Sequence, residues 1–266
     1  MKETLSIVKI GGNVIDNETL LKSFIHEFSK IKGLKILVHG GGKLASEISS
    51  SMGVIPEMIE GRRITNAATL EIVTMVYAGL INKRIVALLQ SNNCNAIGLS
   101  GADANILPAS KRDVGSIDYG FVGDINQSEL NNNNLKVLLQ NGFVPVIAPI
   151  THDTKGQLLN TNADTIASCL GVSLSDTFRV KLYYCFELKG VLQDIKNENS
   201  LIELITPEIF LQLKASQTIS KGMIPKISNA LEAIKNGVNC VYIGHVNYLN
   251  KMMADDVNAG TKITVI

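Results

Sequence analysis

Short apolar runs rich in β-branched residues alternate with longer segments of helical period along almost the whole chain. This alternation is typical of βαβ units around a mostly parallel sheet, and several runs are apolar on both faces, as buried parallel strands tend to be. Strands are predicted at residues 6–10, 35–39, 96–99, 144–148, 179–184 and 240–243. Helices are predicted near residues 17–30, 43–52, 66–90, 128–141, 162–170 and 223–236. The sequence therefore predicts an α/β fold.

Two segments, 53–65 and 117–125, combine glycine with short apolar-polar alternation and indicate hairpins or flaps rather than crossover helices. Loops of this kind often cover a ligand. The chain has no internal repeat and no linker rich in Pro, Gly or Ser, although its motifs change character near 150–155. We expect one domain, 1–266, with two lobes that share a sheet, about 1–150 and about 151–266.

At 266 residues, of which 45% are hydrophobic, the chain is long enough to bury a sizeable core. The 25 Lys and Arg residues nearly balance the 24 Asp and Glu residues, which gives a formal net charge of +1. This balance removes the bulk electrostatic reason to expect a nucleic-acid or membrane-surface partner. Any charge that matters for function must therefore come from a local cluster of residues rather than from the net charge of the chain.

The four cysteines lie far apart and form no C-x-x-C pair. Neither a zinc ribbon nor a disulfide framework is indicated, and a reducing cytoplasm fits best. The N-terminus lacks the basic segment, long apolar run and small-residue cleavage site of a signal peptide. No uninterrupted apolar run approaches roughly 18 residues, so no membrane span is expected.

Two glycine-rich turns, Lys9–Gly12 and His39–Lys43, each follow a predicted strand and precede a predicted helix. Backbone N–H groups in such turns can approach phosphate oxygens, and a lysine at a strand end can supply a point charge. A plain glycine turn with a solvated lysine explains the first turn equally well when it is taken alone. Neither turn matches the P-loop or the dinucleotide fingerprint.

His39 is expected to fill or hydrogen-bond the strand end rather than act as a base or metal ligand.

Two arginines, Arg62 and Arg63, stand in the segment Gly61–Thr65, ahead of a predicted helix. An arginine fork matches a carboxylate bidentately, which a lysine cannot do as well. One of the pair could clamp an acidic substrate, although exposed arginines are usually only solvated.

Polar residues also stand at the starts of two later predicted helices. Asn162 is expected to cap the first of these, which leaves Asn160 and Asp164 for polar contacts, with Asp164 favourably placed in the first turn. In the segment Gly222–Lys226 a lysine stands near a helix N-terminus, where the helix dipole disfavours a cation. Lys226 is therefore expected to serve an anionic ligand.

Taken in order, these motifs resemble those of the amino-acid kinase family, and within it the branch that phosphorylates N-acetyl-L-glutamate. The resemblance covers nearly the whole chain and ends at Gly260–Ile263, which is similar to the closing G-T-x-I of the family. It implies a three-layer αβα sandwich on a central, mostly parallel sheet, with the acidic substrate under the N-terminal lobe and ATP under the C-terminal lobe. The implied reaction moves the γ-phosphoryl group of ATP to the γ-carboxylate of N-acetyl-L-glutamate, a step of arginine biosynthesis.

The resemblance also implies a role for each matching residue. Lys9 and Lys226 resemble the two transition-state lysines, and Asp164 resembles the carboxylate that holds them. Substrate contacts are implied for Gly41, Gly42, Arg63 and Asn160. Nucleotide contacts are implied for Gly11, Gly12, Glu187, Gly222 and Met223. Mg²⁺ would accompany ATP, and no metal site built from protein side chains is implied.

The chemistry of these residues agrees with that reaction. A glutamate γ-carboxylate has a reference pKa of about 4.3, so the nucleophile is already ionised at neutral pH and needs no general base. The difficulty is to bring an anion in line against a polyanion, which calls for positioning, lysines, Mg²⁺ and backbone N–H groups. Lys9 and Lys226 are therefore expected to meet around one phosphoryl group.

The sequence departs from the family pattern at several positions. Phe186 and Glu187 stand where a hydroxyl residue and Asp are usual, which leaves those nucleotide contacts open. Lys221 replaces a common Gly, and Asn66 a common Asp. Arg62 stands at an often apolar position, where an extra cation would favour a longer, charged acyl group such as N-succinyl; a solvated Arg62 is the simpler interpretation.

Arginine-sensitive members of the family carry an additional N-terminal helix that links dimers into hexamers, and Lys9 comes too early to leave room for one. We therefore expect a homodimer that arginine does not inhibit. Two other interpretations stay open: an amino-acid kinase acting on carbamate, aspartate, glutamate or a nucleoside monophosphate, and a non-catalytic sensor of acylglutamate or arginine. A nicotinamide-dependent oxidoreductase would need a dinucleotide fingerprint, which the sequence lacks.

Overall fold

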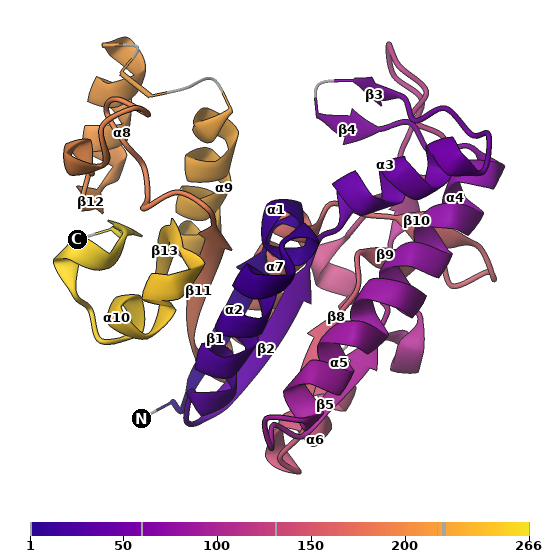
Figure 1. Cartoon of the computed structure of the whole chain (residues 1–266), viewed down its shortest axis with the longest axis horizontal. Coiled ribbons are helices and arrows are strands. Elements are labelled where there is room, and N and C mark those ends of the chain that lie inside the picture. Colours follow the sequence, from indigo (N-terminus) through magenta and orange to yellow (C-terminus); the bar gives the residue numbers. More distant parts are fainter. Residues whose placement is uncertain (1, 60, 131, 217, 220–221, 266) are drawn as a thin grey trace.

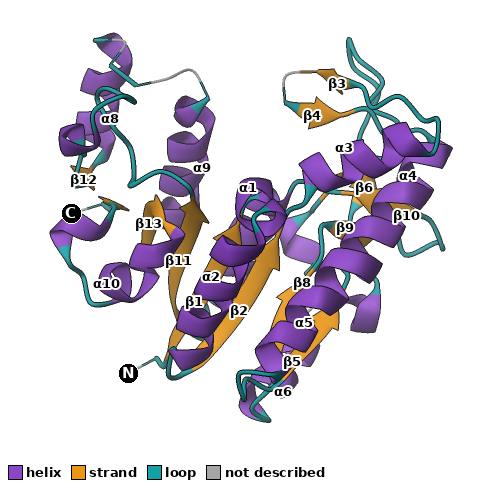
Figure 2. Ribbon diagram, in the orientation of Figure 1, coloured by secondary structure: helices purple, strands orange, loops and turns teal. Residues whose placement is uncertain are grey.

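The computed structural model describes residues 2–59, 61–130, 132–216, 218–219 and 222–265. In that part of the chain an eight-stranded sheet runs through the molecule, and helices cover both of its faces (Figures 1 and 2). The strand order is β12-β14-β13-β11-β1-β2-β8-β5, and all neighbours are parallel except β13 and β14. The strands are β1 Thr4–Ile10, β2 Leu34–His39, β5 Ala96–Leu99, β8 Val144–Ile147, β11 Arg179–Phe186, β12 Leu204–Ile205, β13 Cys240–His245 and β14 Thr261–Ile263. The predicted αβα sandwich on a mostly parallel sheet is confirmed.

Two hydrophobic cores lie on opposite faces of this sheet. Along β1, Leu5 and Ile7 belong to one core, whereas Val8 and Ile10 belong to the other, which is why the strand reads as apolar on both faces. The first core packs under α6 (Asn133–Gln140), α7 (Ala163–Leu174) and α9 (Met223–Lys235), and the second under α2 (Glu18–Lys30), α5 (Asn82–Gln90) and α10 (Leu249–Met253). The other α-helices of the described chain are α1 Gly12–Asp16, α3 Gly42–Ser51, α4 Ala67–Thr74 and α8 Pro207–Ala215.

Helix α4 continues through a π-helical stretch, Met75–Ile81, into α5, so that one helix runs from Ala67 to Gln90. With 24 residues and a mean hydropathy of 1.6, this helix is long and apolar enough to cross a membrane, although the sequence contains no unbroken apolar run of that length. Its buried residues, among them Val73 and Ile85, form part of the core beneath α2. Packing against the sheet therefore accounts for its apolar character.

Short antiparallel pairs flank the sheet near the carboxyl ends of its strands. The hairpin predicted at 53–65 is confirmed as β3 (Met58–Ile59) paired with β4 (Arg62–Arg63), with Glu60 outside the described residues. The prediction at 117–125 was wrong in extent, because β7 (Gly123–Asp124) pairs with an earlier strand, β6 (Ser110–Lys111). Residues 110–112 are all polar or charged and show no alternation, so that strand could not be recognised from its residues. A third pair joins β9 (Ile150–His152) to β10 (Leu158–Asn160).

Several elements of the C-terminal half were not predicted from the sequence, among them β12, β14, α8 and α10. Strands β12 and β14 are only two and three residues long, too short for a period to be visible. Helix α8 does carry a readable start signal, because Thr206 caps it and Pro207 occupies its first position. The helix predicted near 128–141 begins later, at Asn133, and Asn131 lies outside the described residues.

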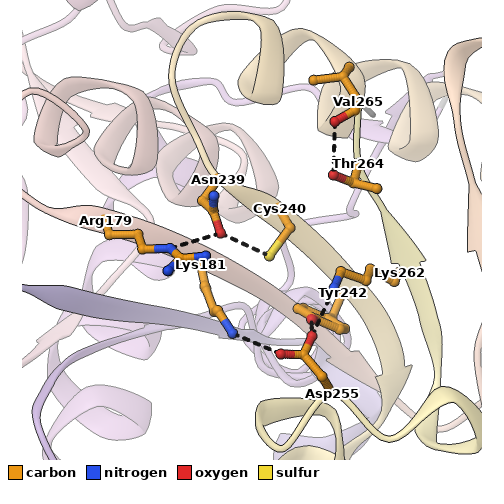
Figure 3. A network of polar contacts seen from close by, with 9 residues as sticks. All are labelled: Arg179, Lys181, Asn239, Cys240, Tyr242, Asp255, Lys262, Thr264 and Val265. Atoms are coloured by element: carbon orange, nitrogen blue, oxygen red, sulfur yellow. Dashed lines mark hydrogen bonds and ion pairs between the residues drawn. The ribbon is translucent and has the colours of Figure 1, made fainter. Parts of the chain in front are cut away.

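A polar network fastens the antiparallel strand β14 and the turn after α10 to the sheet (Figure 3). The carboxylate of Asp255 accepts from Lys262 Nζ at 2.9 Å, from Lys181 Nζ at 3.3 Å and from the Tyr242 hydroxyl. The Tyr242 hydroxyl and the two lysines hold the pKa of the Asp255 carboxyl well below its usual range, even though partial burial opposes them. Three strands, β11, β13 and β14, are thereby joined through one side chain.

Candidate active site

The carboxyl ends of β1, β2 and β11 meet at one edge of the sheet, where four helices, α1, α3, α7 and α9, begin. Ligands of open α/β sheets bind at this edge. A cavity of about 490 Å³ lies there, and most of the residues predicted for the site line it. These are Lys9, Gly11, Gly12, Gly42, Arg63, Asp164, Glu187 and Lys226.

Three charged residues from distant parts of the chain converge in this cavity. Lys9 is the second-to-last residue of β1, Asp164 stands in the first turn of α7, and Lys226 stands in the first turn of α9. The Nζ atoms of Lys9 and Lys226 lie 2.6 Å from Oδ1 and 2.6 Å from Oδ2 of Asp164, respectively. The two lysines are thus bridged by one carboxylate and face the same space.

The protein environment strongly favours the ionised form of Asp164. Its side chain is only 19% exposed, and burial by itself would raise the pKa of the carboxyl. The charges of Lys9 and Lys226 and their hydrogen bonds outweigh burial and hold that pKa well below its usual range. A permanently negative group therefore lies between two cations.

The two glycine turns lie against each other beside this cluster. A Cβ atom on Gly12 would lie 3.8 Å from the backbone N of Gly42, so the turns approach within van der Waals distance. Gly41 has φ +143°, and a Cβ there would lie 2.2 Å from Cδ1 of Ile81, so only glycine fits without a shift. Neither α1 nor α3 has a side-chain cap, which leaves their first N–H groups to meet an anion.

His39 supports the second glycine turn, His39–Lys43, through a contact with the carbonyl of Gly40. It is fully buried, its Nδ1 lies 2.8 Å from the Gly40 carbonyl oxygen, and its Nε2 lies 3.2 Å from Nδ2 of Asn82. The carbonyl can only accept, so Nδ1 carries the proton and Nε2 accepts from Asn82. Burial lowers the pKa of His39 to about 4, so the ring is neutral at physiological pH. The prediction that His39 hydrogen-bonds the strand end is confirmed.

Arg63 is directed into the cavity and is nearly buried. Its Nη2 donates to the Gly42 carbonyl and to Ser46 Oγ, both at 2.7 Å. Its Nη1 is also buried but makes no hydrogen bond within the described residues. Since an unpaired buried donor is costly, this nitrogen indicates that a ligand acceptor belongs beside it. Arg62, the preceding residue of β4, is exposed.

Asn160, at the end of β10, is not among the residues that line the cavity. Its Nδ2 donates to Thr65 Oγ1 at 3.0 Å, and its backbone N–H donates to the Phe121 carbonyl at 2.9 Å. The same loop is held by the backbone N–H of Thr65, which donates to the Tyr119 carbonyl at 2.9 Å. Asn160 thus links β10 to the segment that carries Arg63. As predicted, Asn162 caps α7 by accepting from the N–H groups of residues 164 and 165.

The residues predicted to contact the nucleotide are divided between two places. Gly222 precedes α9, and Met223 lines a second cavity of about 370 Å³ beyond the end of β11. That cavity has an apolar wall and a few polar groups, among them Gln193 and Thr218. Glu187 instead borders the main cavity, where its Oε1 accepts from Asn13 Nδ2 at 2.7 Å. Lys221, a departure from the family pattern, lies outside the described residues.

Several residues that line the main cavity were not predicted from the sequence, among them Lys43 and Tyr184. Lys43 stands in the first turn of α3, and its signal was readable, since the dipole argument applied to Lys226 holds for it too. No sequence signal marked Tyr184 as a site residue, because a tyrosine in a buried strand is usually interpreted as part of the hydrophobic core. Among the described residues no group of three or more His, Cys, Asp and Glu side chains is placed to hold a metal ion.

Comparisons with known proteins agree on one family. The sequence profile of the amino acid kinase family matches residues 4–245. The acetylglutamate kinase of Cytophaga hutchinsonii is 53% identical over 98% of this chain and 98% of its own length. The acetylglutamate kinase of Phocaeicola vulgatus is 49% identical over 94% of this chain and 97% of its own length.

Among solved structures, N-acetylglutamate synthase from Neisseria gonorrhoeae, complexed with coenzyme A and N-acetyl-glutamate, has a TM-score of 0.81 to this chain. The match covers 99% of this chain and 60% of that longer one, and at 21% identity it supports the fold alone. The family profile, by contrast, runs from β1 to β13 and includes both glycine turns, Asp164 and Lys226. The chain therefore belongs to the amino acid kinase family.

Proposed function

We propose that this chain uses ATP to phosphorylate the γ-carboxylate of N-acetyl-L-glutamate, with ADP and the γ-acyl phosphate as products. The observation that carries the proposal is the pair of lysines, Lys9 and Lys226, held on one buried carboxylate beside two glycine turns. Relatives named acetylglutamate kinase, about half identical over nearly the whole chain, support the choice of acceptor. The same reaction is a step of arginine biosynthesis.

The proposed mechanism relies on charge and position. The acceptor carboxylate is ionised at neutral pH and attacks without a general base. Lys9 and Lys226 stabilise the negative charge on the γ-phosphoryl group as it moves from ATP to the acceptor, with ADP as the leaving group. Asp164 keeps the two ammonium groups at a fixed separation, which lowers the cost of bringing two like charges together.

The acceptor would bind in the part of the cavity next to the second glycine turn. Backbone N–H groups at Gly41 and Gly42 would meet its γ-carboxylate, and the unpaired Nη1 of Arg63 would meet its other carboxylate. Asn160 would keep the loop after Arg63 in place through Thr65. This assigns the acidic substrate to the N-terminal lobe, about 1–150, together with β10.

ATP would bind along the C-terminal lobe, about 151–266. Its base would enter the second cavity beside Met223, and its phosphates would reach Gly11, Gly12 and the start of α9 after Gly222. Both carboxylate oxygens of Asp164 contact lysines, so this residue is not a ready Mg²⁺ ligand. Mg²⁺ is therefore expected to be held by the phosphates, where it would offset their negative charge.

An ADP-release assay with hydroxylamine trapping of the acyl phosphate tests the proposed function. Purified protein with MgATP is offered N-acetyl-L-glutamate, N-succinyl-L-glutamate, glutamate, aspartate and carbamate in parallel. We expect ADP and a hydroxamate with N-acetyl-L-glutamate. Binding of acylglutamate without any ADP would instead indicate a sensor, and turnover of only aspartate, glutamate or carbamate would indicate another kinase of the family.

N-Succinyl-L-glutamate is a second candidate acceptor. Arg62 is exposed beside Arg63 and forms no ion pair with any carboxylate of the described residues, so it could receive the extra carboxylate of a succinyl group. A solvated Arg62 explains its exposure more simply. A clear preference of kcat/KM for the acetyl compound would exclude the succinyl proposal.

We also propose that the protein is cytoplasmic, because all four cysteines are free and buried, which fits a reducing compartment.

We further propose that the protein is a homodimer. Met75 and Leu80, in the π-helical stretch of the long helix, are 53% and 51% exposed, so this stretch offers apolar side chains that a second copy of the chain could cover. We expect sedimentation equilibrium to give twice the chain mass of 28.7 kDa, and the double variant Met75→Glu with Leu80→Glu to give monomers. A wild-type monomer would contradict the proposal.

A further inference from the structure

Tyr184 is a buried polar side chain in the wall of the active-site cavity that the proposed mechanism leaves without a role. It lies on β11, and its direct partner on β1 is Lys9. Only 5% of the residue is exposed, although it borders the cavity. Its ring belongs to the core beneath α7, so it faces the helix that carries Asp164.

The hydroxyl of Tyr184 joins this strand to two successive turns of α7. It lies 3.3 Å from the backbone carbonyl oxygen of Asp164 and 2.7 Å from Ser168 Oγ. A carbonyl can only accept, and the tyrosine has one proton, so Tyr184 donates to Asp164 and Ser168 donates to Tyr184. The result is a chain of two hydrogen bonds in which each strengthens the other.

This chain of hydrogen bonds fixes Asp164 relative to the strand that carries Lys9. Asn162 holds the backbone N–H of Asp164 from one side, but Asn162 belongs to the same helix and cannot set the distance to the sheet. The hydroxyl of Tyr184 is anchored on β11, next to Lys9, and holds the carbonyl of Asp164. Burial raises the pKa of the Tyr184 hydroxyl, and the nearby negative charge of Asp164 raises it further, so the hydroxyl stays a donor.

We infer that Tyr184 is a positioning residue, whose hydroxyl sets the place of Asp164 between Lys9 and Lys226 and so aligns the two cations on the transferred phosphoryl group. This inference rests on the proposed function. Ala163, Ile166 and Leu170 pack the buried face of α7 against the sheet, so the helix stays folded without the hydroxyl. The effect of losing it is therefore expected in the first turns of α7, where the hydroxyl contacts Asp164 and Ser168.

The direct test is Tyr184→Phe, which removes one oxygen and keeps the ring. The matched control is Tyr183→Phe, since Tyr183 is the adjacent buried tyrosine of the same strand, and its ring faces the opposite core and stacks on Tyr242 at 5.1 Å. We expect kcat to fall about tenfold in Tyr184→Phe, the loss of one buried hydrogen bond, with both KM values within about twofold. Tyr183→Phe is expected to keep the wild-type kcat.

A double-mutant cycle separates positioning from a general structural effect. If Tyr184 acts through Asp164, adding Tyr184→Phe to Asp164→Asn is expected to lower kcat no further. Ser168→Ala, which removes the donor to Tyr184, is also expected to lower kcat, but by a smaller factor than Tyr184→Phe. Additive losses in the cycle, or equal losses for Tyr184→Phe and Tyr183→Phe, would overturn the inference.

A readout without substrate keeps this test apart from the proposed reaction. Amide hydrogen exchange of residues 163–168 is expected to become about tenfold faster in Tyr184→Phe and to stay unchanged in Tyr183→Phe. If the wild-type protein phosphorylated no acylglutamate but exchange still behaved in this way, the proposed function would fail and the anchoring of Asp164 would stand. Unchanged exchange in Tyr184→Phe would overturn the anchoring itself.

Discussion

Replacing Lys9 with Met is expected to lower kcat by about 10³-fold, the size of loss seen when one preorganised donor to a developing charge is removed. Methionine keeps much of the length and apolar stem of lysine but carries no charge. Lys226 alone would then have to stabilise the moving phosphoryl group. Because Lys9 lies at the end of a central strand and only 13% of its side chain is exposed, solvent cannot easily replace its ammonium group.

Steady-state kinetics with N-acetyl-L-glutamate and ATP as separate variable substrates measure this effect. The control is Lys22→Met, the same substitution at a lysine of α2 that is 60% exposed and pairs with Glu18 one turn away. Lys22→Met is expected to keep the wild-type kcat. A Lys9→Met variant that is folded and has more than about a tenth of wild-type kcat would rule out a transition-state role for Lys9.

The long strands and helices could be predicted from the sequence because their apolar pattern repeats over neighbouring residues. Buried strands such as β1 are apolar on both faces, and the period of α2, α7 and α9 is visible over three or more turns. The position of Lys9 near the end of one strand and of Lys226 near the start of one helix followed from the same patterns. Since all such ends meet at one edge of a parallel sheet, their convergence could be predicted without any structure.

Contacts that depend on the register between strands could not be predicted from the sequence. Nothing in the pattern of β11 indicates that Tyr184 faces the core with α7 whereas Tyr183 faces the opposite core, because both residues suit a buried strand. The strand β6 was missed for a related reason, since its polar residues are held by pairing with β7 rather than by an apolar face. Tertiary pairing fixes these features, and a single sequence contains no local trace of it.

Asp164→Asn is expected to be the most informative change after Lys9→Met, because it affects both activity and stability. An amide has the shape of the carboxylate but no charge, so Lys9 and Lys226 would repel each other at the site where they now share one anion. We expect kcat to fall by about 10²-fold, because two misplaced ammonium groups no longer match the phosphoryl group. Removing one partner from a buried ion cluster costs several kcal/mol, and the 40% exposure of Lys226 reduces this to about 1–3 kcal/mol here.

The pH dependence of that stability difference has a defined sign. The pKa of Asp164 is depressed in the folded protein, so its contribution is complete above the unfolded pKa of about 3.9 and is lost as pH falls below that value. Thermal unfolding at pH 7 and pH 5 should therefore show the same deficit for Asp164→Asn, about 2–8 °C in Tm for a chain of this size. At pH 3.5 and below the deficit should shrink. A deficit that stayed constant down to pH 3, or a variant as stable as wild type at pH 7, would mean that Asp164 does not hold the two lysines as a charged group.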